Sequence, residues 1–178
     1  MAATNPKING TLYLFSAALD LAGKRFEFLG EIAERLLRTP LAQLFDSKKP
    51  LIGENPYRYD HMDVDGAQEL ARLIKETDTI IDECDPNDPF PNKIFAAHSE
   101  CDTTASISGI EDLEKVSIPE QFELYRIKKK YNVSHASLVL KDPIMKDGRE
   151  LEKENPPFQK MMDAIAAFER KRKGSHLK

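Results

Sequence analysis

Apolar positions along the chain alternate between short strand-like runs and longer segments of helical spacing. Residues 10–16 and 93–97 form nearly continuous apolar runs, and residues 122–127 alternate as a third strand that we extend through Val133. Short continuous apolar runs are typical of strands buried on both faces, as in a parallel sheet. The sequence therefore predicts three strands.

Helical spacing recurs in four segments between and after these strands. Apolar residues return every three or four positions in residues 26–37, in 67–81 behind a capping Asp65, in 107–116, and from Pro157 onward. This period places apolar side chains on one face of a helix. The predicted inward positions are Ala67, Leu70, Leu73, Ile74, Thr77 and Ile81, then Ile107, Ile110 and Leu113, then Phe158, Met161, Met162, Ile165 and Phe168.

The resulting order is strand, helices, strand, helix, strand, helix. Such alternation indicates an α/β fold whose parallel strands are joined by right-handed crossovers. Polar, proline-containing connectors over residues 48–65 and 85–91 separate the elements. Three parallel strands alone would leave a buried-type strand at an open edge. We therefore expect an upstream segment or a second subunit to complete the sheet.

Composition narrows the possible partners. The net charge is −4, and the basic residues cluster only at 170–173, where they complement the C-terminal end of a helix dipole. We therefore expect no nucleic-acid partner. Cys84 and Cys101 have neither metal-ligand nor disulfide-framework spacing, so we expect free thiols. Residues 1–7 lack the features of a signal peptide, and the sequence does not indicate a compartment.

Two chemically useful side chains follow successive predicted strands. Asp102 lies just after the second strand, and His135 follows the third. The carboxyl ends of parallel strands meet at one edge of the sheet, where functional loops gather. A carboxylate that orients a general-base imidazole is the arrangement of a Ser-His-acid triad.

These segments resemble the α/β-hydrolase family. Ile94-Phe-Ala-Ala-His-Ser-Glu-Cys-Asp102 is similar to the strand and acid turn of that family, with Ser99 where Gly is common. Ser134-His135-Ala-Ser-Leu138 is similar to its histidine element, again with Ser for Gly, and residues 10–18 resemble the preceding strand. The resemblance implies the C-terminal portion of a mostly parallel α/β-hydrolase sheet with an inserted helical lid.

The same resemblance implies a division of the chain and a chemistry. Residues 1–23 would hold a core strand, 24–90 a helical lid, 91–173 the C-terminal α/β core with the acid and histidine loops, and 174–178 a disordered tail. Asp102 and His135 would serve a serine hydrolase of the carboxylesterase or lipase kind. That reaction transfers an acyl group from an ester or lipid substrate to water and requires no metal or organic cofactor.

The nucleophile is where the sequence departs from the family. The family carries its serine in a G-x-S-x-G turn between a strand and a helix, and the sequence has no such motif. Ser16 follows the first strand but lacks the flanking glycines. We therefore expect an upstream segment or chain to supply the serine, and this chain alone to be inactive.

Other interpretations stay open, two for single residues and two for the whole chain. Asp102 is also suited to a turn that caps the following helix, and His98 to an ordinary buried histidine. The whole chain is alternatively a non-catalytic interaction module completed by oligomerisation. Another possibility is a metal-dependent enzyme using His98, Asp102 and His135, with Glu100 nearby.

Overall fold

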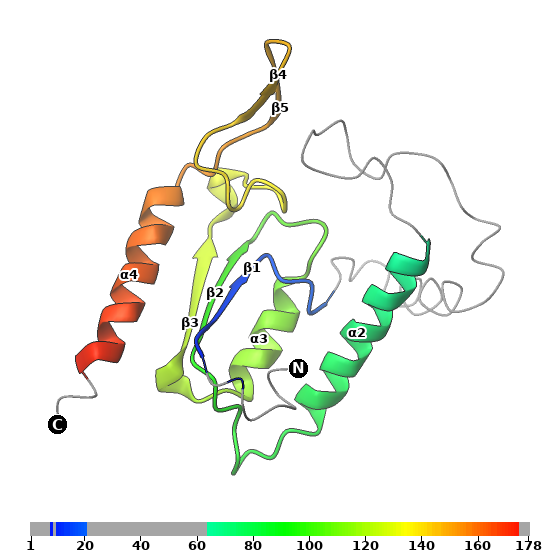
Figure 1. Ribbon diagram of the computed structural model, residues 1–178, viewed down its shortest axis with the longest axis vertical. Helices are drawn as coiled ribbons and strands as arrows, with labels where there is room; N and C mark the ends of the chain where they lie inside the picture. The colour runs from blue at the N-terminus through cyan, green and yellow to red at the C-terminus, as the bar shows by residue number, and fades with distance from the viewer. Residues whose placement is uncertain (1–7, 9, 21–63, 175–178) are drawn as a thin grey trace.

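Three parallel strands form the centre of the molecule. The structure is a computed structural model that describes residue 8 and residues 10–20 and 64–174. Strands β1 (Leu12–Phe15), β2 (Ile94–Ser99) and β3 (Phe122–Ile127) lie in the order β1-β2-β3 (Figure 1). Both neighbouring pairs are parallel. The predicted α/β class with a parallel sheet is therefore confirmed.

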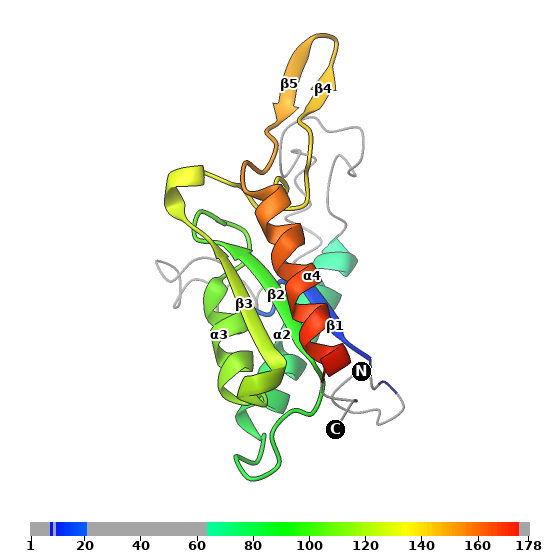
Figure 2. The same cartoon turned by 90° about the vertical axis from the view of Figure 1, so that its left-hand side faces the viewer.

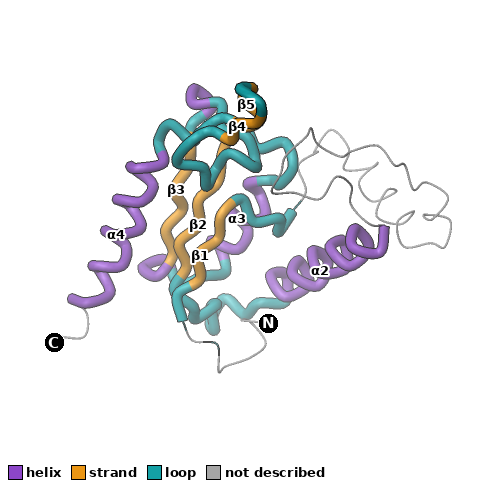
Figure 3. The backbone as a smooth tube through the Cα atoms, turned by 45° about the horizontal axis from the view of Figure 1, so that its top comes forward, coloured by secondary structure: helices purple, strands orange, loops and turns teal. Residues whose placement is uncertain are grey.

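Helices cover both faces of this sheet. Helix α4 (Phe158–Gly174) lies against one face and α3 (Ile107–Lys115) against the other, as Figure 2 shows. Helix α2 (Val64–Asp82) lies on the same side as α3 (Figure 3). Parallel sheets require this arrangement, because their strands are apolar on both faces.

Strand β2 is the most buried element. All six of its residues are buried, and its side chains alternate between the two helical layers. Phe95 and Ala97 join the core that includes Met161 and Phe168 of α4. The rings of Phe95 and Phe168 meet edge to face with centroids 5.6 Å apart, a favoured geometry for aromatic pairs.

Strand β1 lies at one end of the described sheet. Among the described strands it pairs only with β2. Its residues are half-buried, apart from the exposed Tyr13, whereas β2 is buried throughout. The three predicted parallel strands were expected to leave an apolar strand at an open edge, and β1 has that position among the strands that the structure describes.

The segment after β1 packs against the start of α3. The Ser106 amide donates to the Asp20 carbonyl at 2.8 Å, and the Ser108 hydroxyl donates to the Asp20 carboxylate at 2.7 Å. Ser106 is also the N-cap of α3, since its hydroxyl accepts from the Ser108 amide. The two segments approach closely because Gly109 has no side chain between them. An added Cβ there would lie 2.8 Å from the Asp20 nitrogen.

The chain between β3 and α4 differs from the prediction. Strand β3 ends at Ile127 rather than Val133, because the chain turns through a 3-10 helix (Lys129–Tyr131) and a left-handed Asn132. A hairpin of β4 (Ile144–Lys146) and β5 (Arg149–Glu152) was not predicted. Its turn has positive φ at Asp147 and Gly148, as hairpin turns with right-handed twist require.

Helix boundaries and faces differ in detail. Helix α2 begins at Val64, so Asp65 lies inside it instead of capping it. Leu73 and Met162 are exposed, although the helical spacing had placed them inward. Of the predicted inward positions, Ile74, Ile110, Met161 and Phe168 are buried. The last two helices otherwise lie where the spacing placed them.

Several predictions fall on other parts of the chain. The helix at 26–37, the connector at 48–63 and residues 175–178 lie outside the described residues, whereas Gly174 belongs to α4. The division into core, lid and tail therefore stays a prediction. Within the described residues, none of the helices combines the length and the apolar character needed to cross a bilayer. Cys84 and Cys101 are free thiols, as expected.

The contact around Gly109 gives a test of the packing. Gly109→Ala is expected to lower the free energy of unfolding by about 1–3 kcal/mol, because overpacking against the backbone of Leu19 and Asp20 outweighs the better helix propensity of alanine. Urea denaturation measures the change. Gly10→Ala is the matched control, since nothing lies within 4 Å of a Cβ at Gly10. Equal stability of the two variants would contradict this packing.

Candidate active site

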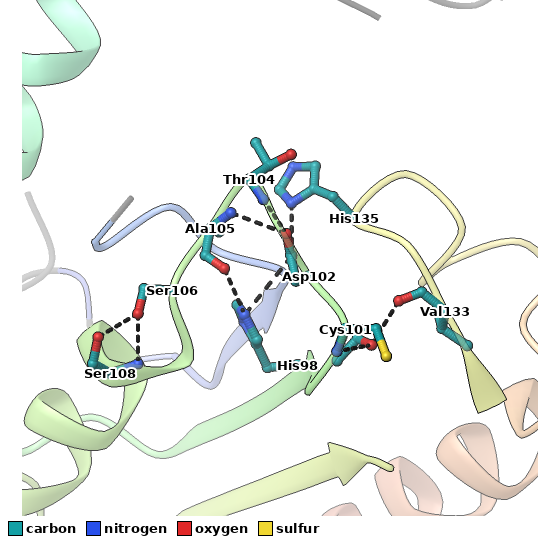
Figure 4. Close-up of polar contacts among 10 residues, drawn as sticks. His98, Cys101, Asp102, Thr104, Ala105, Ser106, Ser108, Val133 and His135 are labelled. Carbon is teal, nitrogen blue, oxygen red and sulfur yellow. Dashed lines mark hydrogen bonds and ion pairs between the residues drawn. The ribbon is translucent and has the colours of Figure 1, made fainter. Parts of the chain in front are cut away.

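Asp102 and His135 meet at the carboxyl edge of the sheet. Asp102 follows β2, and His135 lies in the loop beyond β3. Nδ1 of His135 lies 2.8 Å from Oδ2 of Asp102 (Figure 4). The structure therefore brings together the two residues that the sequence singled out, which lie 33 positions apart.

The second carboxylate oxygen of Asp102 holds its own turn. Oδ1 accepts hydrogen bonds from the Thr104 amide at 2.8 Å and the Ala105 amide at 3.0 Å. The Asp102 amide donates to the Ser99 carbonyl at 3.1 Å and closes the preceding turn. Asp102 does not cap α3, because Ser106 takes that role. One oxygen thus stabilises local structure while the other contacts His135.

Asp102 is held in its ionised form. Its side chain has no exposed surface. Burial raises the pKa of Asp102, but hydrogen bonds from the Ala105 and Thr104 amides and from His135 together lower it further, so the pKa lies below its ordinary value. A buried carboxylate with several donors keeps its charge in this way.

The charge on Asp102 determines the tautomer of His135. An ionised carboxylate only accepts hydrogen bonds, so Nδ1 of His135 must be the donor. In a neutral imidazole the lone pair then lies on Nε2, on the opposite side of the ring. The His135 side chain is 33% exposed while that of Asp102 is buried. The basic Nε2 of His135 therefore lies on the side of the ring that faces away from the buried Asp102.

His98 lies beneath this pair. It is fully buried, and its Nε2 donates to the Ala105 carbonyl at 3.2 Å. The same nitrogen lies 3.7 Å from Oδ2 of Asp102. Burial lowers the pKa of His98 more than the Ala105 hydrogen bond and the Asp102 charge raise it. His98 is therefore a neutral core histidine that holds the turn carrying Asp102.

The residues of the metal-dependent alternative do not form a ligand set. Glu100 turns to Lys128, whose Nζ donates at 2.9 Å, and to the Lys129 amide, which donates at 3.1 Å. Across residues 10–20 and 64–174, no three His, Cys, Asp or Glu side chains gather in a way that could hold a metal ion. The described residues thus offer this alternative no site.

Two supporting residues were not identified from the sequence. Ser99 donates from its hydroxyl to the Val133 carbonyl at 2.6 Å. Asn155 is buried and donates to the Leu138 carbonyl at 2.7 Å, which closes the base of the excursion that includes the β4–β5 hairpin. Both positions carry features in the sequence that could have identified them. Ser99 replaces the glycine that is common in the acid turn, and Asn155 precedes two prolines.

Ser16 has an unusual environment at the end of β1. Its φ is 45°, its amide donates to the Ala97 carbonyl at 3.0 Å, and its buried hydroxyl has no hydrogen-bond partner among the described residues. A non-glycine residue with positive φ is uncommon in proteins. The serine nevertheless lacks the glycine-flanked turn of a hydrolase nucleophile.

The parallel sheet and its helices are consistent with part of an α/β-hydrolase-like fold. A similar solved structure is the monoacylglycerol lipase of Paleococcus ferrophilus, with a TM-score of 0.59, 12% sequence identity, and 94% of this chain aligned. The chain spans 61% of the length of that lipase. No protein-family profile matches the sequence, and no curated protein is significantly similar to it. At this identity the likeness shows the fold alone.

The lowered pKa of His98 predicts a loss of stability in mild acid. The unfolded chain binds a proton near pH 6.5, the ordinary pKa, whereas the folded chain binds it only at lower pH. Stability is therefore fully present above pH 6.5 and falls as the pH decreases toward the folded pKa, by up to about 1.4 kcal/mol at pH 5.5.

Urea denaturation at pH 7.5 and 5.5 tests this expectation. The unmodified chain should lose more stability between the two pH values than His98→Gln, which keeps an amide donor near Ala105 but does not titrate. An equal loss in the two proteins would show that His98 is not buried in its neutral form.

Proposed function

We propose that this chain is the part of a serine hydrolase that carries the acid and the histidine, acting on carboxylic esters. Asp102 would orient the imidazole and His135 would be the general base. The serine and the oxyanion-binding amides would come from an upstream segment or a separate chain. The observation that carries the proposal is the 2.8 Å contact between His135 Nδ1 and the buried carboxylate of Asp102.

The contact between His135 and Asp102 supports a role for the imidazole in the proton transfers of ester hydrolysis. Nε2 of His135 would take the proton of a serine hydroxyl as that oxygen attacks the ester carbonyl, and would then give it to the departing alcohol. Asp102 would stabilise the imidazolium formed in between, because its charge is already fixed next to Nδ1. In the second half of the reaction, a water molecule would attack the acyl-serine and give a proton to Nε2 of His135. The acid product would form as the serine oxygen leaves and takes that proton back.

Two further observations support completion by another segment. The solved lipase with a similar fold is longer than the aligned region, since the chain spans 61% of it. Strand β1 lies at the end of the described sheet and is only half-buried, although its sequence is apolar. Additional strands beside β1 would bury it and would bring a nucleophile to the same sheet edge.

The neighbouring lipase suggests a first substrate to test. That protein is described as a monoacylglycerol lipase, so monoacylglycerols and short acyl esters are reasonable candidates for this chain once it is completed. No metal ion or organic cofactor takes part in the proposed steps.

Labelling with a fluorophosphonate probe tests the proposal. The probe reacts with a serine activated by a neighbouring base. We expect no labelling of this chain alone, and labelling of the serine on the upstream segment when the two are combined. His135→Ala in this chain should abolish that labelling, whereas Lys141→Ala, an exposed position in the same loop, should leave it unchanged.

Other outcomes would contradict the proposal in different ways. Labelling of the chain alone would indicate an internal nucleophile, with Ser16 the first candidate because its buried hydroxyl is unpartnered among the described residues. Absence of labelling in the combined sample, together with a stable oligomer that is insensitive to His135→Ala, would favour the non-catalytic interaction module.

A further inference from the structure

The hydroxyl of Ser99 connects the two loops that carry Asp102 and His135. Ser99 is the last residue of β2 and is 2% exposed. Its oxygen donates to the Val133 carbonyl at 2.6 Å and accepts from the Cys101 amide at 3.1 Å. One buried oxygen atom therefore contacts the residue just before Asp102 and the residue two positions before His135.

The contact with Val133 matters because regular pairing has already ended. Ser99 lies opposite Ile127, the last residue of β3. Beyond it the chain passes through the 3-10 helix and the left-handed Asn132 before reaching Val133. Glu100 holds the first part of this excursion through Lys128 and Lys129. Ser99 instead holds its far end, next to His135.

The contact with Cys101 orients the acid turn. The Cys101 amide points at the Ser99 hydroxyl, and the Asp102 amide points at the Ser99 carbonyl at 3.1 Å. Both amides are fixed by the same residue, so the direction in which the Asp102 side chain leaves the backbone depends on Ser99. Glycine at this position would keep the carbonyl contact but would lose both hydroxyl contacts.

We propose that Ser99 is a positioning residue that sets the separation of Asp102 and His135 and thereby keeps the proton of the neutral imidazole on Nδ1. Its importance for catalysis rests on the proposed hydrolase function. The positioning itself is a property of this chain and is measurable without a nucleophile.

Nitrogen NMR of His135 tests the positioning directly. The shifts of the two ring nitrogens, read on the alkaline plateau of a pH series, report which nitrogen carries the proton. In the unmodified chain we expect the Nδ1-protonated form to dominate. In Ser99→Ala the ratio of Nδ1-protonated to Nε2-protonated imidazole should fall by roughly threefold to tenfold, as the loss of one hydrogen bond allows.

Ser117→Ala is the matched control. Ser117 is also buried, and its hydroxyl donates to the Leu113 carbonyl at 2.7 Å, just before the opposite end of β3. Both variants lose one buried hydroxyl-to-carbonyl hydrogen bond and should be destabilised similarly. Only Ser99→Ala should change the tautomer of His135. An equal tautomer ratio in the two variants would overturn the proposal.

A second pair of variants separates the hydroxyl from packing. Ser99→Thr and Ser99→Val add the same volume to the buried site, but only threonine keeps the hydroxyl. The threonine variant should retain the Nδ1-protonated imidazole and the valine variant should lose it. Identical spectra would show that shape alone positions His135. Because these spectra need no probe and no upstream segment, their failure is distinct from a failure of the labelling experiment.

Discussion

The buried carboxylate of Asp102 determines how the loops around it are built. A carboxylate removed from water is strongly destabilising unless other donors replace the lost hydration. Two amides of its own turn and the ring N–H of His135 do so here. The amide contacts impose a tight turn immediately after β2. The ring contact requires the loop beyond β3 to return to the same edge of the sheet, so one charge constrains both loops.

Strand β2 makes this arrangement possible because it serves both layers of the molecule. Its alternate side chains Phe95 and Ala97 pack toward α4, whereas His98 reaches the Ala105 carbonyl before α3. The strand then ends in Ser99, whose hydroxyl contacts the segment leading to His135. The residues that form the core are thus continuous with those that hold the acid. Stability and site geometry therefore depend on the same six residues.

The sequence predicts the parts of this fold that follow from local patterns. The apolar run of β2 and the spacing of α4 indicate their elements directly, and the order of parallel strands predicts that Asp102 and His135 share an edge. The sequence pattern does not predict the hairpin of β4 and β5, because its two strands are short and rich in charged residues. The path from β3 to His135 depends on the left-handed Asn132 and on a hydrogen bond between residues 34 positions apart, and neither leaves a periodic signal.

If the surrounding donors stabilise the buried charge of Asp102, they must lower the pH at which its carboxylate takes up a proton. Measuring that titration midpoint is therefore the most direct test. Carbon NMR of the side-chain carboxyl in the folded chain reports this pH. The structure predicts a midpoint below the ordinary value of 3.8, and a higher midpoint in His135→Ala, because one donor is lost. A midpoint above 3.8, or one that His135→Ala leaves unchanged, would contradict the account.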